Sequence, residues 1–77
     1  ADRHAELELR RQALDGCVAR LPPADRDLVE RHYTRHQTVP QIAGETGRNP
    51  HTLYKALQRV RRQLYECVTA RVAADEA

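Results

Sequence analysis

The sequence predicts an all-α fold, a small four-helix domain containing a helix-turn-helix. Apolar residues recur at helical spacing, and prolines and capping residues stand between the periodic segments. The 77 residues include no Phe, Trp or Met, so a core must come from Leu, Val, Ile, Ala and Tyr. Residues that favour strands are scattered instead of alternating. We therefore predict one domain, spanning residues 1–77, in which short helices share one core.

The N-terminal helix is predicted within residues 1–20, from about Asp2 to Arg20. Its expected apolar stripe is Leu7, Leu14, Val18 and Leu21, with Ala13 and Cys17 beside it. Pro22 and Pro23 end this helix because neither can donate a backbone hydrogen bond within it.

The second helix is predicted from Pro23 to about His36. Asp25 and Asp27 lie near its start, where the helix dipole favours negative charge. Its inner face is expected to be Leu28, Val29, His32 and Tyr33.

A helix-turn-helix is predicted over residues 38–65. Thr38 and Gln41 have the spacing of a capping box, which begins a short helix over 39–46. Gly47 supplies the turn, because glycine takes a positive φ without strain. The order of short helix, glycine turn and longer helix is typical of the motif.

The second helix of the motif is predicted over 50–68, capped by Asn49 and opened by Pro50. Its apolar seam consists of Leu53, Leu57, Val60, Leu64 and Val68, which lie within roughly 80° on a helical wheel. The opposite face carries His51, Lys55, Gln58, Arg59 and Arg62. Residues 69–77 are expected to fray.

Charge is concentrated on this second helix. Residues 46–65 hold five basic residues and no acidic one, although the whole chain has a net charge of only +2. A local excess of positive charge favours a polyanion partner. Because the second helix of the motif enters the DNA major groove in such proteins, we expect binding to double-stranded DNA.

Two stretches resemble region 4 of bacterial sigma factors, particularly the extracytoplasmic-function group. They are LPPADRDLVERHY and TVPQIAGETGRNPHTLYKALQRVRRQL. The matching elements are Leu21-Pro22, Arg31-His32-Tyr33, Ile42-Ala43, Gly47, Thr52-Leu53 and the run from Leu57 to Leu64. Thr46, Arg48, Gly44 and Pro40 depart from the family pattern.

This resemblance implies a promoter-recognition role for the C-terminal domain of an alternative sigma factor. The implied partners are promoter DNA at the −35 element, RNA polymerase core through its β flap, and an anti-sigma factor. Transferred by position, the resemblance places Tyr54, Lys55, Gln58 and Arg59 against bases, with His51 and Thr52 near the start of the helix. Arg48, Arg61 and Arg62 are placed against phosphates. It also implies a cytoplasmic location.

Two alternatives stay open at this stage. One is a LuxR-type response-regulator DNA-binding domain, which shares the four-helix plan; Leu21-Pro22-Pro23 and Arg61-Arg62 favour sigma over it. The other is a helical protein-interaction module whose basic face binds an acidic partner. Tyr54 lies at the edge of the seam, where it can serve either the core or readout.

Other signals are discounted. Cys17 and Cys67 are expected to be buried free thiols in a reducing cytosol, although a disulfide is the alternative. His32 and His36 have metal-ligand spacing but lack the further ligands that zinc needs, so His32 is expected to be half-buried and His36 solvated. No catalytic grouping, cofactor motif or membrane span is predicted, and we expect no enzymatic activity.

Overall fold

A computed structural model of the chain describes residues 3–76 and confirms the all-α prediction. The helices are α1 (Arg3–Ala19), α2 (Pro23–Val29), α3 (Val39–Thr46) and α4 (Pro50–Glu76), and a π-helical turn, η1 (Glu30–Thr34), continues α2. No strand occurs among these residues. Asp2, where the first helix was expected to begin, lies outside them.

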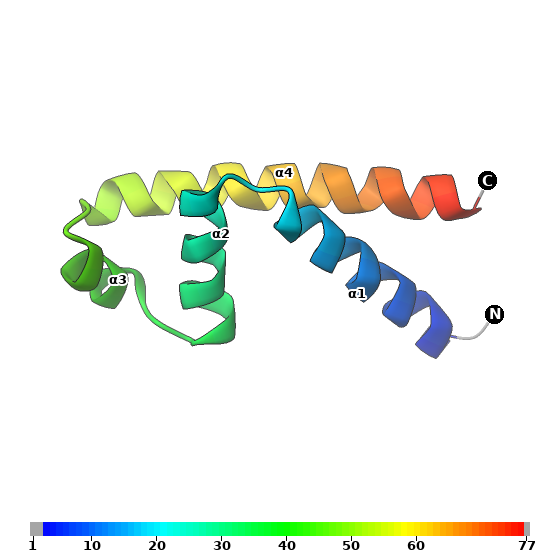
Figure 1. Cartoon of the computed structure of the whole chain (residues 1–77), viewed down its shortest axis with the longest axis horizontal. Coiled ribbons are helices and arrows are strands. Elements are labelled where there is room, and N and C mark those ends of the chain that lie inside the picture. Colours follow the sequence, from blue (N-terminus) through cyan, green and yellow to red (C-terminus); the bar gives the residue numbers. More distant parts are fainter. Residues whose placement is uncertain (1–2, 77) are drawn as a thin grey trace.

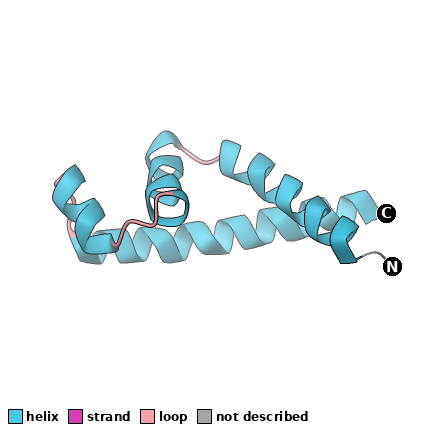
Figure 2. Ribbon diagram, turned by 90° about the horizontal axis from the view of Figure 1, so that it is seen from below, coloured by secondary structure: helices cyan, strands magenta, loops and turns pink. Residues whose placement is uncertain are grey.

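The long helix α4 organises the molecule (Figure 1). It extends along the longest dimension, 45 Å, and each of the other three helices contacts it. In Figures 1 and 2, α3 lies at the N-terminal end of α4, α2 lies against the N-terminal half of α4, and α1 runs obliquely beside its C-terminal half. The N-terminal half of α4 is therefore braced by α2 and α3.

The core joins the motif to α2. It consists of Leu28, Val39, Ile42, Leu53, Ala56 and Leu57, with Ala43 packed against it. Leu53, Leu57 and Val60 are at most 4% exposed, which confirms the first part of the predicted seam. Leu64 and Val68 are only half-buried, so the seam opens as α4 leaves the core.

The leucine stripe predicted for α1 does not form the interface with α4. Ala13 and Cys17 are buried, whereas Leu7 is 61% and Leu14 is 40% exposed. The predicted stripe lies on the apolar side of α1. The small residues beside the stripe, however, are the ones that allow α1 to approach α4 closely. Two large leucines consequently remain on the surface.

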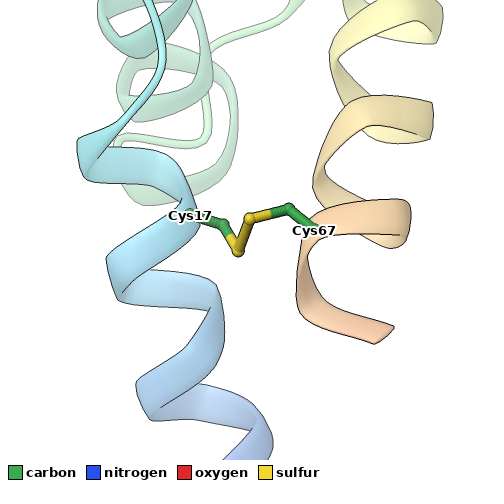
Figure 3. Close-up of a disulfide and its surroundings, with 2 residues drawn as sticks. All are labelled: Cys17 and Cys67. Atoms are coloured by element: carbon green, nitrogen blue, oxygen red, sulfur yellow. A yellow bond between two sulfur atoms is a disulfide. The ribbon is translucent and has the colours of Figure 1, made fainter. Parts of the chain in front are cut away.

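Cys17 and Cys67 form a disulfide between α1 and α4 (Figure 3), so the expectation of free thiols is wrong. The crossing of the two helices brings the Cα atoms to 6.0 Å, a separation that a disulfide spans. The pair is 50 residues apart in the chain, and no local spacing reveals it.

The second helix differs from the prediction of one regular helix to His36. The α-helix ends at Val29, and η1 follows with a hydrogen bond from Arg35 N–H to Glu30 O of 3.0 Å. A π-helical turn rotates the side chains that follow it relative to α-helical register. Tyr33, expected on the inner face, is accordingly 44% exposed. The expectation of a half-buried His32 and a solvated His36 is confirmed.

The helix α4 ends later than the sequence predicts. The helix continues past Val68 to Glu76, through most of the segment expected to fray. Two observations explain the added length: α1 packs along this part of α4, and Val72 is buried. Ala77 lies outside the described residues.

Candidate nucleic-acid interface

The first helix of the motif, α3, is capped at both ends. Thr38 Oγ1 accepts a hydrogen bond from Gln41 N–H at 3.2 Å, and Gln41 Oε1 accepts one from Thr38 N–H at 2.8 Å. These two bonds confirm the predicted capping box. At the other end Gly47 has φ = 71° and donates its N–H to Ala43 O, as a glycine C-cap does.

The start of α4 is also capped as predicted. Asn49 Oδ1 accepts a hydrogen bond from His51 N–H at 2.8 Å, and Pro50 is the first helical residue. The cap fixes where α4 begins relative to Gly47. The first two turns of α4 are therefore presented in one orientation, with Leu53 fully buried behind them.

Burial separates the two faces of α4. Eight of the nine predicted DNA contacts are exposed: His51, Thr52, Tyr54, Lys55, Gln58, Arg59, Arg61 and Arg62. The ninth, Arg48, is half-buried beside the turn. Tyr54 is 53% exposed, which assigns it to the surface and not the core.

Arg59 has an intramolecular partner that sequence reasoning did not find. Its two terminal nitrogens, Nη1 and Nη2, donate to Oδ2 and Oδ1 of Asp25, each at 3.0 Å. The hydrogen bond from Asp25, together with the attraction of its charge, raises the pKa of Arg59 above its usual value. From the sequence, Asp25 is recognisable only as an acidic residue near the start of α2. The partner lies 34 residues away, so only the packing of α2 on α4 reveals the pair.

Arg61 is directed toward η1. Its Nε donates to the Tyr33 hydroxyl, and its guanidinium carbon lies 5.6 Å from the centroid of the Tyr33 ring. Such a contact is a cation–π interaction. Arg61 is exposed, but it sits at the border between the basic face of α4 and the surface formed with η1.

A third arginine, Arg31, links the two bracing helices. It bonds Asp27 through Nε at 2.9 Å and pairs with Glu45 of α3 through Nη1. The bond to Asp27, followed by the charges of Asp27 and Glu45, raises the pKa of Arg31 against a lowering effect of desolvation. Gln37 donates to the same Glu45 carboxylate at 3.1 Å. These exposed contacts contribute modestly to stability, but they keep the Glu45 carboxylate of α3 paired.

Unlike the three arginines above, the α4 side chains Lys55, Gln58 and Arg62 form no ion pair or side-chain hydrogen bond within residues 3–76. They project from the face opposite Leu53 and Leu57, and no acidic residue occurs between Thr46 and Tyr65. A surface of this kind can hold a phosphate backbone and offer donors to base edges.

Within the described residues, no group of three or more His, Cys, Asp or Glu side chains is placed to hold a metal ion. No helix among the described residues is long and apolar enough to cross a membrane.

Comparison with known proteins points to one family. The family model described as Sigma-70, region 4 matches residues 11–64, more than half of the chain. The match runs from within α1 to Leu64 and includes α3, the turn at Gly47 and α4 as far as Leu64. No curated protein and no solved structure matches the chain.

Proposed function

Because the chain belongs to the sigma-70 region 4 family, we propose that it recognises promoter −35 DNA for an alternative sigma factor of the extracytoplasmic-function group. The family is a DNA-binding, non-enzymatic transcription-factor domain that works with RNA polymerase. One observation carries the proposal beyond the family: the acid-free, exposed face of α4, held opposite the buried side chains Leu53, Leu57 and Val60. In this proposal the domain works in the cytoplasm, together with RNA polymerase.

The N-terminal half of α4 is the segment that enters the major groove in this proposal. His51 and Lys55 lie in its first two turns and Gln58 follows, so their side chains reach base edges. Tyr54 and Thr52 flank them, on either side of the basic face. Arg59 also reads a base, under the constraint that Asp25 imposes.

Phosphate contacts are assigned to the ends of this surface. Arg48 lies beside the turn, and Arg62 lies one turn beyond Gln58, where a docked helix leaves the groove. Arg61 remains a predicted phosphate contact, although Tyr33 holds its guanidinium at the border of the surface.

The polymerase contact is proposed for a groove on the other side of α4. The groove has a volume of about 600 Å³ and lies between α1, α2, η1 and α4. Its apolar lining includes Leu14, Val18, Val29, Tyr33 and Leu64. Leu14 is one of the two exposed α1 leucines, and Tyr33 is the residue that η1 turns outward. We place the β flap of RNA polymerase in this groove, which Arg61 separates from the basic face, and we propose that an anti-sigma factor competes for the same apolar surface.

Competition between duplexes tests the DNA-binding proposal. Fluorescence anisotropy should show that a cognate −35 duplex displaces a labelled probe at lower concentration than a scrambled duplex. Lys55→Ala should cost about 1–3 kcal/mol on the cognate duplex and reduce that preference. Its melting temperature should match the parent's, because Lys55 is exposed and unpaired within the described chain. Equal displacement by both duplexes would favour a module that binds an acidic protein.

A retention assay tests the groove separately. An immobilised flap fragment should retain the parent domain, and Leu14→Glu should abolish retention while leaving DNA binding intact. A known sigma factor serves as the positive control. If that control is retained and the parent is not, the groove is not the flap site.

A further inference from the structure

The ion pair between Asp25 and Arg59 joins α2 to the DNA-facing helix. Asp25 is a buried charged residue, 7% exposed, in the first turn of α2. Its position is fixed by the helix that Pro23 opens, where the dipole also favours a carboxylate. Both of its oxygens are bonded by Arg59. The carboxylate therefore acts as a rigid acceptor for one arginine.

The pairing leaves part of the guanidinium available. A guanidinium carries five N–H donors, and the two bonds to Asp25 use one donor from each terminal nitrogen. The Nε–H and the remaining N–H groups have no other partner among residues 3–76. The Arg59 side chain is 51% exposed, against 10% for Asp25, so the arginine covers the acid and still faces solvent.

Arg59 also lies on the DNA-facing side of α4, one turn after Lys55. Guanine offers two acceptors, N7 and O6, to an arginine in the major groove. A guanidinium already held by a carboxylate loses little freedom when it meets such an edge. Since the pair carries no net charge, it adds little to the release of counterions from phosphates.

We propose that Asp25 is a specificity-determining positioning residue, which holds Arg59 for reading a guanine edge and withholds its charge from the phosphate backbone. The proposal rests on the DNA-binding function proposed above. Asp25 itself touches no base.

Asp25→Asn is the informative change, because it removes the charge while preserving the shape of the side chain. The pair then carries a net positive charge, and Arg59 gains rotational freedom and can meet a phosphate. For scrambled duplexes, the plot of log association constant against log salt should steepen by about 0.9. That corresponds to about an eightfold larger loss of affinity for each tenfold rise in salt. The ratio of cognate to scrambled affinity should fall by about tenfold, as expected when one bidentate base contact is lost.

A double-mutant cycle shows whether Asp25 acts through Arg59. Asp25→Asn should change neither the slope nor the affinity ratio when introduced into Arg59→Ala. Glu8→Gln is the matched control, because it removes one carboxylate and the partner of one arginine, Arg11, on α1. That control should leave slope and ratio at parent values. Circular dichroism melts establish that each variant is folded at the temperature of binding.

The outcomes distinguish a failure of the proposed DNA-binding function from a failure of the role proposed for Asp25. If the parent shows no preference for the cognate duplex, the proposed function fails. If the parent shows a preference and Asp25→Asn leaves both slope and ratio unchanged, the role of Asp25 is refuted. It is also refuted if Asp25→Asn has its full effect in the Arg59→Ala background. If Asp25→Asn does not fold, Arg59→Lys replaces it in the test. This variant keeps a positive charge beside Asp25 but lacks the paired N–H donors of a guanidinium. The ratio of cognate to scrambled affinity should therefore fall while the salt slope stays unchanged.

Discussion

Individual side chains of α4 serve either the core or the partner surface, and the division falls between direct neighbours in the sequence. Leu57 is 4% exposed, whereas Gln58 beside it is exposed. The helical period alone predicts this division, and burial confirms it. Arg59 and Arg61 depart from it, since both lie on the exposed side and yet hold contacts to other helices. Contacts of this kind depend on tertiary packing, which the helical period does not encode.

Leu57→Ala should lower the free energy of unfolding by about 2–5 kcal/mol, through lost transfer energy and the cavity left in the core. Urea denaturation followed by circular dichroism measures the change. Gln58→Ala is the control and should stay within about 0.5 kcal/mol of the parent. A loss for Leu57→Ala as small as that of the control would place Leu57 outside the core.

Arg62→Ala should weaken binding to cognate and scrambled duplexes by the same factor. The reason is that a phosphate contact carries no sequence information. The salt slope should decrease by about one unit, which anisotropy titrations at several salt concentrations measure. A selective loss on the cognate duplex would instead make Arg62 a base-reading residue.

Helix boundaries could be predicted wherever a local side chain sets them. Thr38, Gly47 and Asn49 each act within three or four residues of their own position, and the structure has all three in the predicted roles. The π-helical turn and the true end of α4 have no such local signal. They reflect how η1 lies against α3 and how α1 packs along α4.

Two glycines of the motif provide a paired test of the turn. Gly47 has φ = 71° and Gly44 lies inside α3, and an added Cβ meets nothing within 4 Å at either position. Gly47→Ala should therefore destabilise the domain by about 1–2 kcal/mol through backbone strain alone. Gly44→Ala should stabilise it by about 0.5–1 kcal/mol. Thermal melts of both variants measure the difference, and equal effects would contradict the left-handed C-cap.

At the scale of the whole molecule, the disulfide determines how firmly α1 is attached. The helix offers few large buried side chains to α4, since Leu7 and Leu14 remain 61% and 40% exposed. Cys17 and Cys67 therefore supply a covalent link where apolar packing is thin. The sequence indicated that both cysteines sit at apolar helical positions. Which residues α1 turns toward α4 depends on the crossing of the two helices, and for that reason the pairing escaped prediction.

Replacing both cysteines by serine should lower the free energy of unfolding by about 4 kcal/mol. This is the chain-entropy value for a closed loop of about 50 residues. Parallel melts of the parent with and without a reducing agent measure the same contribution without a mutation. The serine variant should be insensitive to the reductant. A parent whose melting does not change on reduction would show that packing alone holds α1 in place.

Binding-site selection from genomic duplexes tests the central claim, that the basic face of α4 reads promoter DNA, most directly. The folded parent domain should enrich one short motif upstream of transcription start sites, and Lys55→Ala should enrich it less. Selection by Leu14→Glu should be unchanged, because Leu14 lines the groove on the other side of α4. If the folded parent enriches no motif, or if Lys55→Ala enriches the same motif to the same extent, α4 does not recognise DNA in the way described.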